Sequence, residues 1–502
     1  MWNRLKDRVG AVFAVNALPL LLYSGERACC AAAGISMDIP WGYFQLLDRN
    51  DLLAHPFWSL FFLHSQPPVL NALLAIILRL SAMTGVAPFF WADVFFTAAG
   101  AAVVWGFFRL ALRLTSSLAL ATVGTVFLLM DPGTHVFQHQ YFYPLLLQAL
   151  LIGMALFSLR FLSWGRTTDF CAAAAMMMVV CNTSTLYHPL WALLTAGLLV
   201  AARRRAMARG TLRWPVWAGL AALAIGVTVW PLKNLAVFGQ FTYSTWEGLN
   251  LARGTEAMSV LAGDEWRPEA QAGLVSLHER FPGAPLNVVA GNVKCDGSIN
   301  QNQYGFVTLN PRLTTAAVRW RFGHPGEWAG LAVTQYAMWT RASYADGYRE
   351  GLAVPGNEAY RRYALAHWAL FYADLRPLAE TASARWASLG VSRITGRPVP
   401  LTLFGWGVFP LILIGTLALN WKPAVRQGDA VAGVCLLMAL CILWVMGVPC
   451  LTDGQEGNRM RFAVDPFILA LGLRLALRFR LLPTAGRNVY GEGVHHRERS
   501  GT

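Results

Sequence analysis

Long apolar stretches recur along this 502-residue sequence, and they limit what the chain can fold into. Most are long enough to cross the hydrocarbon core of a bilayer as a helix. Only 14% of the residues are charged, whereas an average soluble protein has roughly 25%. We therefore expect an all-α polytopic membrane protein with about ten transmembrane helices, at residues 10–24, 87–110, 117–130, 142–163, 170–186, 187–202, 214–232, 399–420, 430–449 and 463–480.

The distribution of charge predicts how these helices cross the membrane. The formal net charge is +14, which by itself would be compatible with nucleic-acid binding. When the N-terminus is placed inside, however, the segments on that side hold the whole positive excess, as the positive-inside rule requires. We therefore expect no nucleic-acid partner. The charge instead indicates a multi-pass protein of the cell (inner) membrane with both termini in the cytoplasm.

One apolar segment, residues 68–84, does not fit the pattern of a crossing helix. It carries Arg79, which would cost about 3 kcal/mol near the centre of a bilayer. A crossing here would also move Arg109 to the outer side, against the charge rule. Residues 41–62 mix aromatic with charged side chains, which favours amphipathic helices at the interface. We predict that residues 41–84 lie on, or dip into, the outer surface.

These assignments divide the chain into four parts. The first is a transmembrane module with a long external loop. The second has Gly/Pro turns and helical stretches near 313–340 and 357–388, which predict a small, mostly α external domain. The C-terminal transmembrane helices and a polar, disordered cytoplasmic tail follow. The predicted boundaries are 1–232 with its loop at 25–86, then 233–398, 399–482 and 483–502.

Unusual polar residues gather on the outer side of this topology, whereas the inner side offers only basic anchors. An enzyme with a lipid-linked substrate requires a polar cluster of this kind, supported by transmembrane helices that lie in the lipid. The reactive head then meets protein groups just above the hydrocarbon, while the tail stays in the lipid. The residues are Asp38, His64, Gln66, Asp93, His135, His139, Tyr141, His188, Lys233, Asn234, Glu456, Arg459 and Arg461.

Three separate segments carry recognisable patterns on this side. In ISMDIPWGYFQLLDRNDLL and FLHSQPPVLNALLAIILRL, an acidic residue is followed by an interfacial helix and a His-x-x-Pro-Pro element. VWPLKNLAVFGQF stands where a predicted span leaves the membrane, and NRMRFAVDPFILALG opens the last one. In this order they resemble the GT-C-fold integral membrane glycosyltransferases, in particular family 39, the protein O-mannosyltransferases and the aminoarabinose transferase-like enzymes.

The sequence departs from the family pattern at three points. The family has Asp-Glu where this chain has Asp38-Ile39. It has His-Pro-Pro where this chain inserts two residues after His64. Ala463 occupies the position of the proline that closes the family's arginine motif.

The resemblance implies an inverting glycosyltransferase that moves a hexose or pentose from a polyprenyl-phosphate-linked donor. The acceptor, on the extracytoplasmic side, would be a lipid, a glycan or a protein. In such a mechanism Asp38 would be the catalytic base. A hydroxyl acceptor needs a carboxylate to take its proton, and a single carboxylate suffices for inversion. The alternative for Asp38 is a helix cap or a surface acid before Pro40.

Three basic residues are candidates for binding the donor phosphate. The guanidinium groups of Arg459 and Arg461 suit an oxyanion whose charge grows as the sugar departs. Lys233 ends a predicted span and is the third candidate. Each of them is alternatively an interfacial side chain that reaches toward lipid phosphates.

The remaining candidate substrate-binding residues are neutral or acidic. The prolines after Gln66 predict an extended approach to a helix start, where the amide groups favour an anion. His64 and Gln66 would then lie beside the phosphate, or merely mark the helix start. Asp93 would bind sugar hydroxyls or pair with a neighbouring span. His139 and Tyr141 complete the set.

A divalent metal is conceivable near the outer histidines, but we favour direct stabilisation by arginine and lysine and expect no cofactor. No carboxylate accompanies His135 and His139 at ligand spacing. The eight cysteines also show no metal-binding pattern. They would be unpaired, or form one disulfide among those that face outward.

Two rival functions remain open at this stage. A transporter or flippase of lipid-linked saccharides would also bind such donors, but transporters usually contain repeated halves with broken helices at mid-membrane, and this sequence has no evident repeat. A receptor-like relative that binds the donor without turning it over is the second rival. The expected partners are the polyprenyl-phosphate sugar, the acceptor and membrane lipids.

Overall fold

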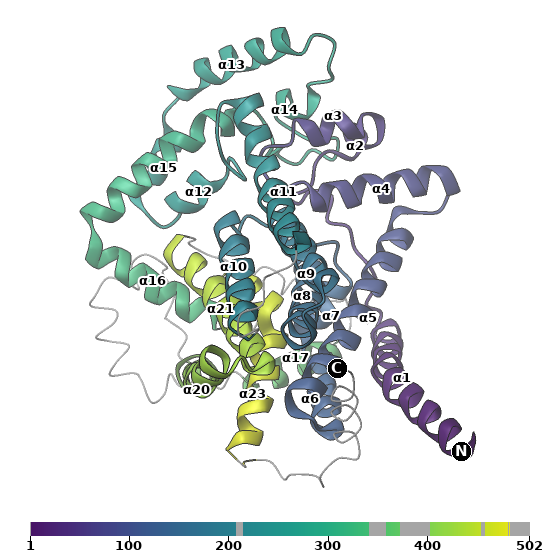
Figure 1. Ribbon diagram of the computed structural model, residues 1–502. Helices are drawn as coiled ribbons and strands as arrows, with labels where there is room; N and C mark the ends of the chain where they lie inside the picture. The colour runs from purple at the N-terminus through teal and green to yellow at the C-terminus, as the bar shows by residue number, and fades with distance from the viewer. Residues whose placement is uncertain are drawn as a thin grey trace.

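The structure is a computed structural model that describes residues 2–206, 214–340, 358–371, 402–452, 457–479 and 481. Within these residues the chain forms helices and isolated β-bridges but no β-strand (Figure 1). The predicted all-α class is thereby confirmed for the described part of the chain. The predicted tail 483–502, Glu456 and part of the predicted helical stretch 357–388 lie outside it.

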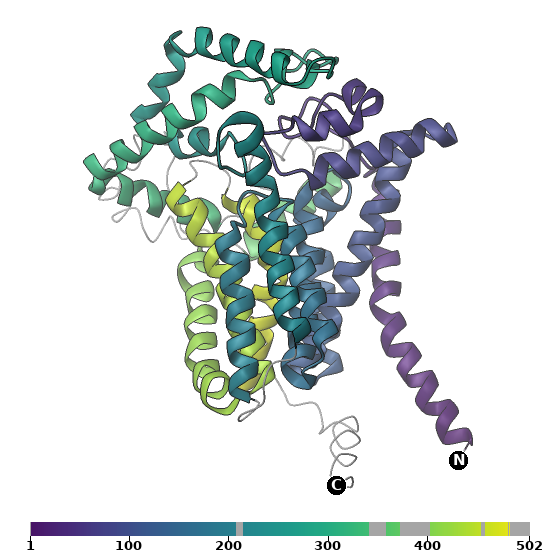
Figure 2. The same cartoon turned by 45° about the horizontal axis from the view of Figure 1, so that its top comes forward.

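A bundle of long helices forms the body of the molecule (Figures 1 and 2). It is built from both ends of the sequence. Its helices are α1 (Trp2–Ala32), α5 (Pro88–Thr115), α6 (Leu118–Met130), α7 (Pro132–Gln138), α8 (Tyr143–Trp164), α9 (Thr167–Cys181), α10 (Pro189–Ala206), α11 (Trp214–Phe238), η2 (Phe404–Val408), α20 (Phe409–Lys422), η3 (Pro423–Gln427), α21 (Ala430–Thr452), α22 (Gly457–Arg461), η4 (Phe462–Val464) and α23 (Asp465–Arg478).

Five helices in the described part of the chain are long and apolar enough to cross a membrane. These are α5, α8, α11, α21 and the continuous helix Phe404–Gln427. A sixth results if α6 and α7, which meet at an angle of 66°, form one broken span. The other predicted spans are helical, but α9 and α23 have only 15 and 14 residues. The structure thus has the helices of a membrane protein, with five or six clear candidates in place of the predicted ten.

Glycines allow the bundle helices to approach closely. A Cβ atom on Gly106 of α5 would lie 2.7 Å from Cγ2 of Ile152 on α8. One on Gly100 would lie 2.4 Å from the hydroxyl oxygen of Tyr23 on α1. Small residues at helix crossings are typical of packing within a bilayer, where burial of apolar surface alone does not drive association.

The predicted interfacial segment forms three helices, α2 (Arg49–Ala54), α3 (Pro56–Phe61) and α4 (Val69–Thr84). Figure 2 shows α4 at a steep angle to the bundle helices and close to one end of them. Arg79 of α4 is exposed. This arrangement agrees with the prediction that the segment lies across the end of the bundle and does not cross with it.

A further helical layer covers the same end of the bundle (Figure 2). Helices α12 and α15 pack together in it around a small separate core that includes Ala252, Leu309 and Leu313. From there α16 returns to α21 and α22. The elements that follow α11 are α12 (Glu247–Ala252), η1 (Glu256–Ala262), α13 (Trp266–Arg280), α14 (Asn287–Ala290), α15 (Gly305–Gly323), α16 (Pro325–Trp339) and α17 (Glu358–Phe371).

Lys294 and Asp48 fasten this layer to the first loop. The Lys294 ammonium group donates to the carbonyl oxygens of Trp41 and Tyr43, both at 3.0 Å, and of Leu46 at 3.3 Å. Asp48 caps α2 and also accepts the Cys295 N–H at 2.5 Å. Burial alone would raise the pKa of Asp48, but these backbone hydrogen bonds outweigh it and hold the pKa below its usual value.

The Lys294→Met variant is expected to lower the free energy of unfolding by about 2–4 kcal/mol, because three carbonyl groups lose a charged donor. The measurement is the thermal unfolding midpoint in detergent. Lys422→Met is the matched control, since Lys422 is exposed at the other end of the bundle. Equal midpoints for the two variants would contradict a fastening role for Lys294.

Candidate functional site

Asp38 lies where the first loop meets the segment between α7 and α8. Its N–H donates to the carbonyl oxygen of His139, and its own carbonyl accepts the N–H of Tyr141, both at 2.8 Å. The two segments therefore pair as in a parallel β-bridge. The backbone is fixed by these contacts while the Asp38 residue is exposed. The carboxylate is therefore held at the surface of this end of the bundle.

His139 and Asp93 share an arginine that the sequence reasoning missed. Arg27 of α1 pairs with Asp93 at 2.6 Å and donates to Nε2 of His139 at 2.5 Å. Nδ1 of His139 donates to the carbonyl oxygen of His135 at 2.8 Å. Burial, followed by the charge of Arg27, lowers the pKa of His139 to about 4. The ring is therefore neutral and positions Arg27; Asp93 pairs with α1, one of the two roles considered for it.

Tyr141 is fully buried, and its hydroxyl donates to the carbonyl oxygen of Leu70 at 2.7 Å. Its ring packs on Phe96 at a centroid distance of 5.4 Å. These contacts join α4 to the segment before α8. Tyr141 is therefore a packing residue in this structure, and the substrate contact expected of it stays a prediction.

Arg459 is held in an aromatic cradle. Its guanidinium group donates to the hydroxyl of Tyr43 at 2.5 Å and to that of Tyr143 at 3.4 Å. It lies over the ring of Phe142, 4.8 Å from the centroid. Such stacking on aromatic faces stabilises a buried cation. The first loop, the start of α8 and α22 therefore meet at this side chain.

Arg461 is buried differently, at 0% exposure. Nε pairs with Asp465 at 2.8 Å, and Nη1 donates to the carbonyl oxygen of Trp339 at 2.9 Å. The guanidinium also lies over the rings of Trp339 and Phe404. These contacts hold α22 against α16 and α23. Arg461 therefore positions the turn that carries Arg459, and phosphate binding by either arginine stays a prediction.

His64 and Lys233 form a separate buried group. Nδ1 of His64 lies 2.7 Å from the hydroxyl of Thr245, and Asn302 accepts the His64 N–H at 2.9 Å. Lys233 donates to the carbonyl oxygen of Leu63 at 2.5 Å and lies over the ring of Trp230. Both side chains thus hold the loop before α4, and the structure gives neither one a place in the cavity described below. Gln66 is partly exposed beside them.

Acidification is expected to destabilise the protein through His64. Burial, followed by the charge of Lys233, lowers the pKa of His64 to about 3 from an ordinary value of 6.5. The unfolded state therefore binds the extra proton between these values, and stability falls as pH falls below about 6.5. The contribution is about 2 kcal/mol at pH 5. Between pH 7 and pH 5, the thermal unfolding midpoint should fall less for the His64→Asn variant than for the wild type.

The matched control for that prediction is His278→Asn, because His278 is exposed on α13. This variant should lose as much stability as the wild type over the same pH interval. An identical loss in all three proteins would contradict the assignment to His64.

A cavity of about 260 Å³ opens beside Arg459, between the bundle and the helical layer above it. Of the predicted site residues, Arg459 alone lines it. Phe44 and Trp246 stack at 4.9 Å on its wall. The wall of the cavity also includes the side chains of Gln45, Tyr143, His188 and Glu247. The first turn of α8, the last turns of α21 and the start of α12 thus supply one polar, aromatic chamber.

Glu247 is the acidic residue of this chamber, and the sequence reasoning missed it. Burial raises the pKa of its carboxyl group, and the neighbouring hydroxyl of Thr242 and backbone of Tyr243 and Ser244 oppose part of this rise. The next residue, Gly248, fits α12 tightly against α15, because a Cβ there would lie 2.4 Å from the carbonyl oxygen of Asn310. The sequence signal that could have identified Glu247 is the segment TWEG, in which an acidic residue precedes a glycine shortly after the end of a predicted span.

His188 lines the chamber from the start of α10. Its Nδ1 accepts the N–H of Leu190 at 3.2 Å. In the neutral ring Nε2 therefore carries the proton and can donate to an oxygen of a bound ligand. The sequence pointed to His188 as one of the outer polar residues but did not assign it to the site.

One group in the described part of the chain has side chains suited to a metal ion. Glu26, Cys30 and His135 bring their ligand atoms within 4.8 Å of one another. Nε2 of His135, however, lies 2.7 Å from the carbonyl oxygen of Leu129, a contact that requires it to carry a proton. A metal would have to displace this contact. All eight cysteines lie in the described residues, and none forms a disulfide.

No protein-family model matches this chain, and neither do any curated proteins or solved structures. The resemblance to GT-C glycosyltransferases therefore depends on the three quoted segments. Two of them contribute to the chamber: the first loop through Phe44 and Gln45, and the arginine segment through Arg459.

Proposed function

We propose that the protein is an integral membrane glycosyltransferase of the GT-C type. It would transfer a sugar, with inversion, from a polyprenyl-phosphate donor to an acceptor at the outer face of the membrane. The observation that carries the proposal is the chamber at one end of the bundle, which the buried Arg459 lines together with Glu247 and His188. A cation, a carboxylate and a hydrogen-bond donor are the groups that a sugar phosphate needs.

Arg459 is the phosphate-binding residue in this proposal. A guanidinium group binds two oxygens of a phosphate at once. Because the aromatic cradle already holds it in place, little rearrangement is needed as the phosphate gains charge. The apolar tail of the donor would lie along the bundle, whose α21 and α8 reach the chamber with Trp444 and Tyr143.

Asp38 is the proposed base, and Glu247 binds hydroxyls of the sugar. Tyr141, which pairs with Asp38, is two residues from Tyr143 on the chamber wall. This places the Asp38 backbone on the order of 10 Å from the chamber. An acceptor that approaches from the exposed side of Asp38 would then meet a sugar whose phosphate is bound at Arg459. Glu247 lines the chamber beside the polar groups of Thr242 and Ser244, which suits a positioning role.

The direct test supplies purified protein in vesicles with polyprenyl-phosphate sugars labelled in the sugar. If the protein is catalytic, unlabelled polyprenyl phosphate should be released. The labelled sugar should then be found either free, after transfer to water, or attached to an acceptor in an added membrane extract. Movement of the intact labelled lipid across the vesicle membrane without release would support a transporter and contradict the proposal. Binding of the donor with neither outcome would indicate a receptor-like protein.

A further inference from the structure

A second cavity lies in the bundle at the end opposite the chamber. Its volume is about 690 Å³, and it is bounded chiefly by α5 and α8. Arg160 and Trp164 lie in the last turns of α8, whereas Tyr143 of the chamber begins that helix. A helix of 22 residues is about 30 Å long, so the part of this cavity near Arg160 and Trp164 is separated from the chamber by about the thickness of a bilayer core.

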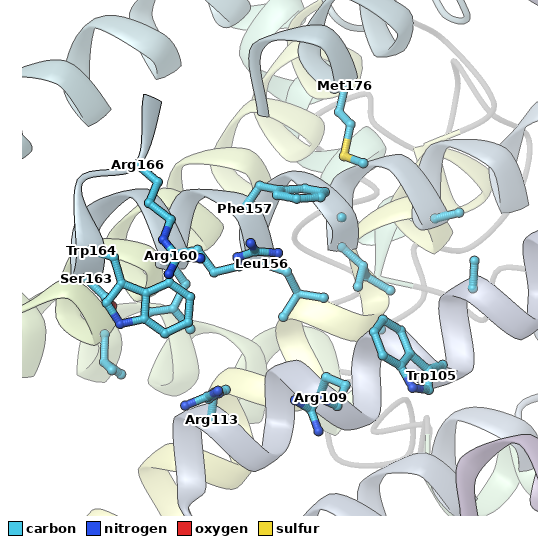
Figure 3. Close-up of a pocket in the computed structure, with 17 residues that line it drawn as sticks. Trp105, Arg109, Arg113, Leu156, Phe157, Arg160, Ser163, Trp164, Arg166 and Met176 are labelled. Atoms are coloured by element: carbon cyan, nitrogen blue, oxygen red, sulfur yellow. The ribbon is translucent and has the colours of Figure 1, made fainter. Parts of the chain in front are cut away.

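Four arginines line this second cavity, which we call the arginine pocket. Figure 3 shows Arg109 and Arg113 on one side of it and Arg160 and Arg166 on the other. Arg160 pairs with Asp169 at 3.0 Å. Arg109 donates to the neutral amide of Asn16 at 3.1 Å. The positive charge of the pocket is therefore only partly compensated.

Arg113 and Arg166 are exposed at its rim, and within the described residues neither forms an ion pair with a carboxylate. Positively charged side chains gathered around one opening repel one another unless an anion lies among them. This arrangement favours a bound anion at the rim.

The rest of the wall is apolar and aromatic. Trp105, Leu156, Phe157 and Trp164 line it (Figure 3). Arg160 and Arg166 lie over the ring of Trp164, 5.8 and 5.1 Å from its centroid. Tryptophan and arginine together are typical of the headgroup level of a membrane. A ligand that fills this pocket needs an anionic head and an apolar chain.

We propose that the arginine pocket binds one anionic phospholipid of the leaflet on its own side of the membrane. The phosphate would lie between Arg113 and Arg166, with one acyl chain against Leu156 and Phe157. The charge distribution predicts that this is the cytoplasmic leaflet. The site is separate from the donor chamber and does not depend on the proposed transfer reaction.

The test compares wild-type protein with the double variant Arg113→Gln/Arg166→Gln in nanodiscs of phosphatidylcholine with a small fraction of phosphatidylglycerol. Native mass spectrometry counts the phosphatidylglycerol molecules retained at increasing collision energy. Each arginine near an anionic headgroup contributes on the order of fivefold in affinity. Retention by the double variant should therefore fall by about tenfold to thirtyfold.

The matched control is Arg204→Gln, because Arg204 is exposed at the same end of the bundle, on α10, and lies over Trp217 outside the pocket. It should retain phosphatidylglycerol as the wild type does. If the control and the double variant lost phosphatidylglycerol equally, the effect would be due to general surface charge, and the proposal would be overturned. Displacement of the lipid by millimolar inorganic phosphate would also overturn it, because this would indicate a site for free phosphate. Unchanged thermal midpoints show that each variant is folded.

Discussion

The Asp38→Asn variant is expected to transfer sugar about 10²–10⁴-fold more slowly than the wild type, because the amide cannot accept the proton of the attacking hydroxyl. The Asp38 backbone contacts with His139 and Tyr141 do not involve the carboxylate, so the fold should be preserved. The measurement is kcat with a saturating polyprenyl-phosphate donor, together with the thermal midpoint. Donor binding should be nearly unchanged.

The Glu247→Gln variant distinguishes the role of Glu247 from that of Asp38. This change keeps the size of the side chain in the chamber but removes its negative charge. We expect mainly a higher KM for the donor, with a smaller effect on kcat. If Glu247→Gln abolished turnover while Asp38→Asn did not, Glu247 would be the base and the assignment to Asp38 would be wrong. Asp264→Asn, an exposed carboxylate in a surface ion pair, is the control.

Removal of Arg459 should be nearly as severe. The Arg459→Ala variant is expected to lose about 10²–10³-fold in transfer rate, the magnitude typical of one preorganised donor to a developing oxyanion. Arg459→Lys should recover only part of this loss, because an ammonium group cannot bind two phosphate oxygens in a fixed plane. Release of polyprenyl phosphate measures both variants.

Arg459 also joins three segments, so its loss could disturb the fold. Thermal midpoints therefore accompany the rates, and Arg267→Ala, which removes a surface ion pair on α13, is the control. The Arg461→Lys variant distinguishes a structural effect from loss of phosphate binding. It should lower the thermal midpoint, because it loosens α22 from Trp339 and Asp465. A folded Arg459→Ala protein with wild-type turnover would contradict a phosphate-binding role.

Much of the fold could be predicted from the sequence. Apolar stretches of helical length predict α5, α8, α11 and α21, because the cost of burying backbone polar groups in lipid leaves a helix as the simplest solution. Helix α4, which carries Arg79, lies at a steep angle to the bundle helices (Figure 2), and its predicted place at the membrane surface stays a prediction. The predicted count of ten spans is not confirmed, since five or six helices of the described residues are clear candidates and α9 and α23 are apolar but short. Composition alone does not tell a short buried helix from a crossing one.

The candidate site was predicted less completely. The arginine segment pointed to Arg459 and Arg461 alike, although they stand only two residues apart. In the structure one lines the chamber, and the other is enclosed by Trp339, Phe404 and Asp465. The partners of Arg461 come from distant parts of the chain. A short motif cannot tell which of its side chains such partners will cover.

The sequence by itself determined the helical class, the placement of charge along the chain and the residue types at the chamber end of the bundle. These properties follow from local periodicity and from the cost of charge in lipid, which each segment meets independently. Glu247 in the chamber, the burial of His64 and the arginine pocket were decided by tertiary packing. They require helices distant in sequence to meet, and the free energy of such contacts depends on every partner at once.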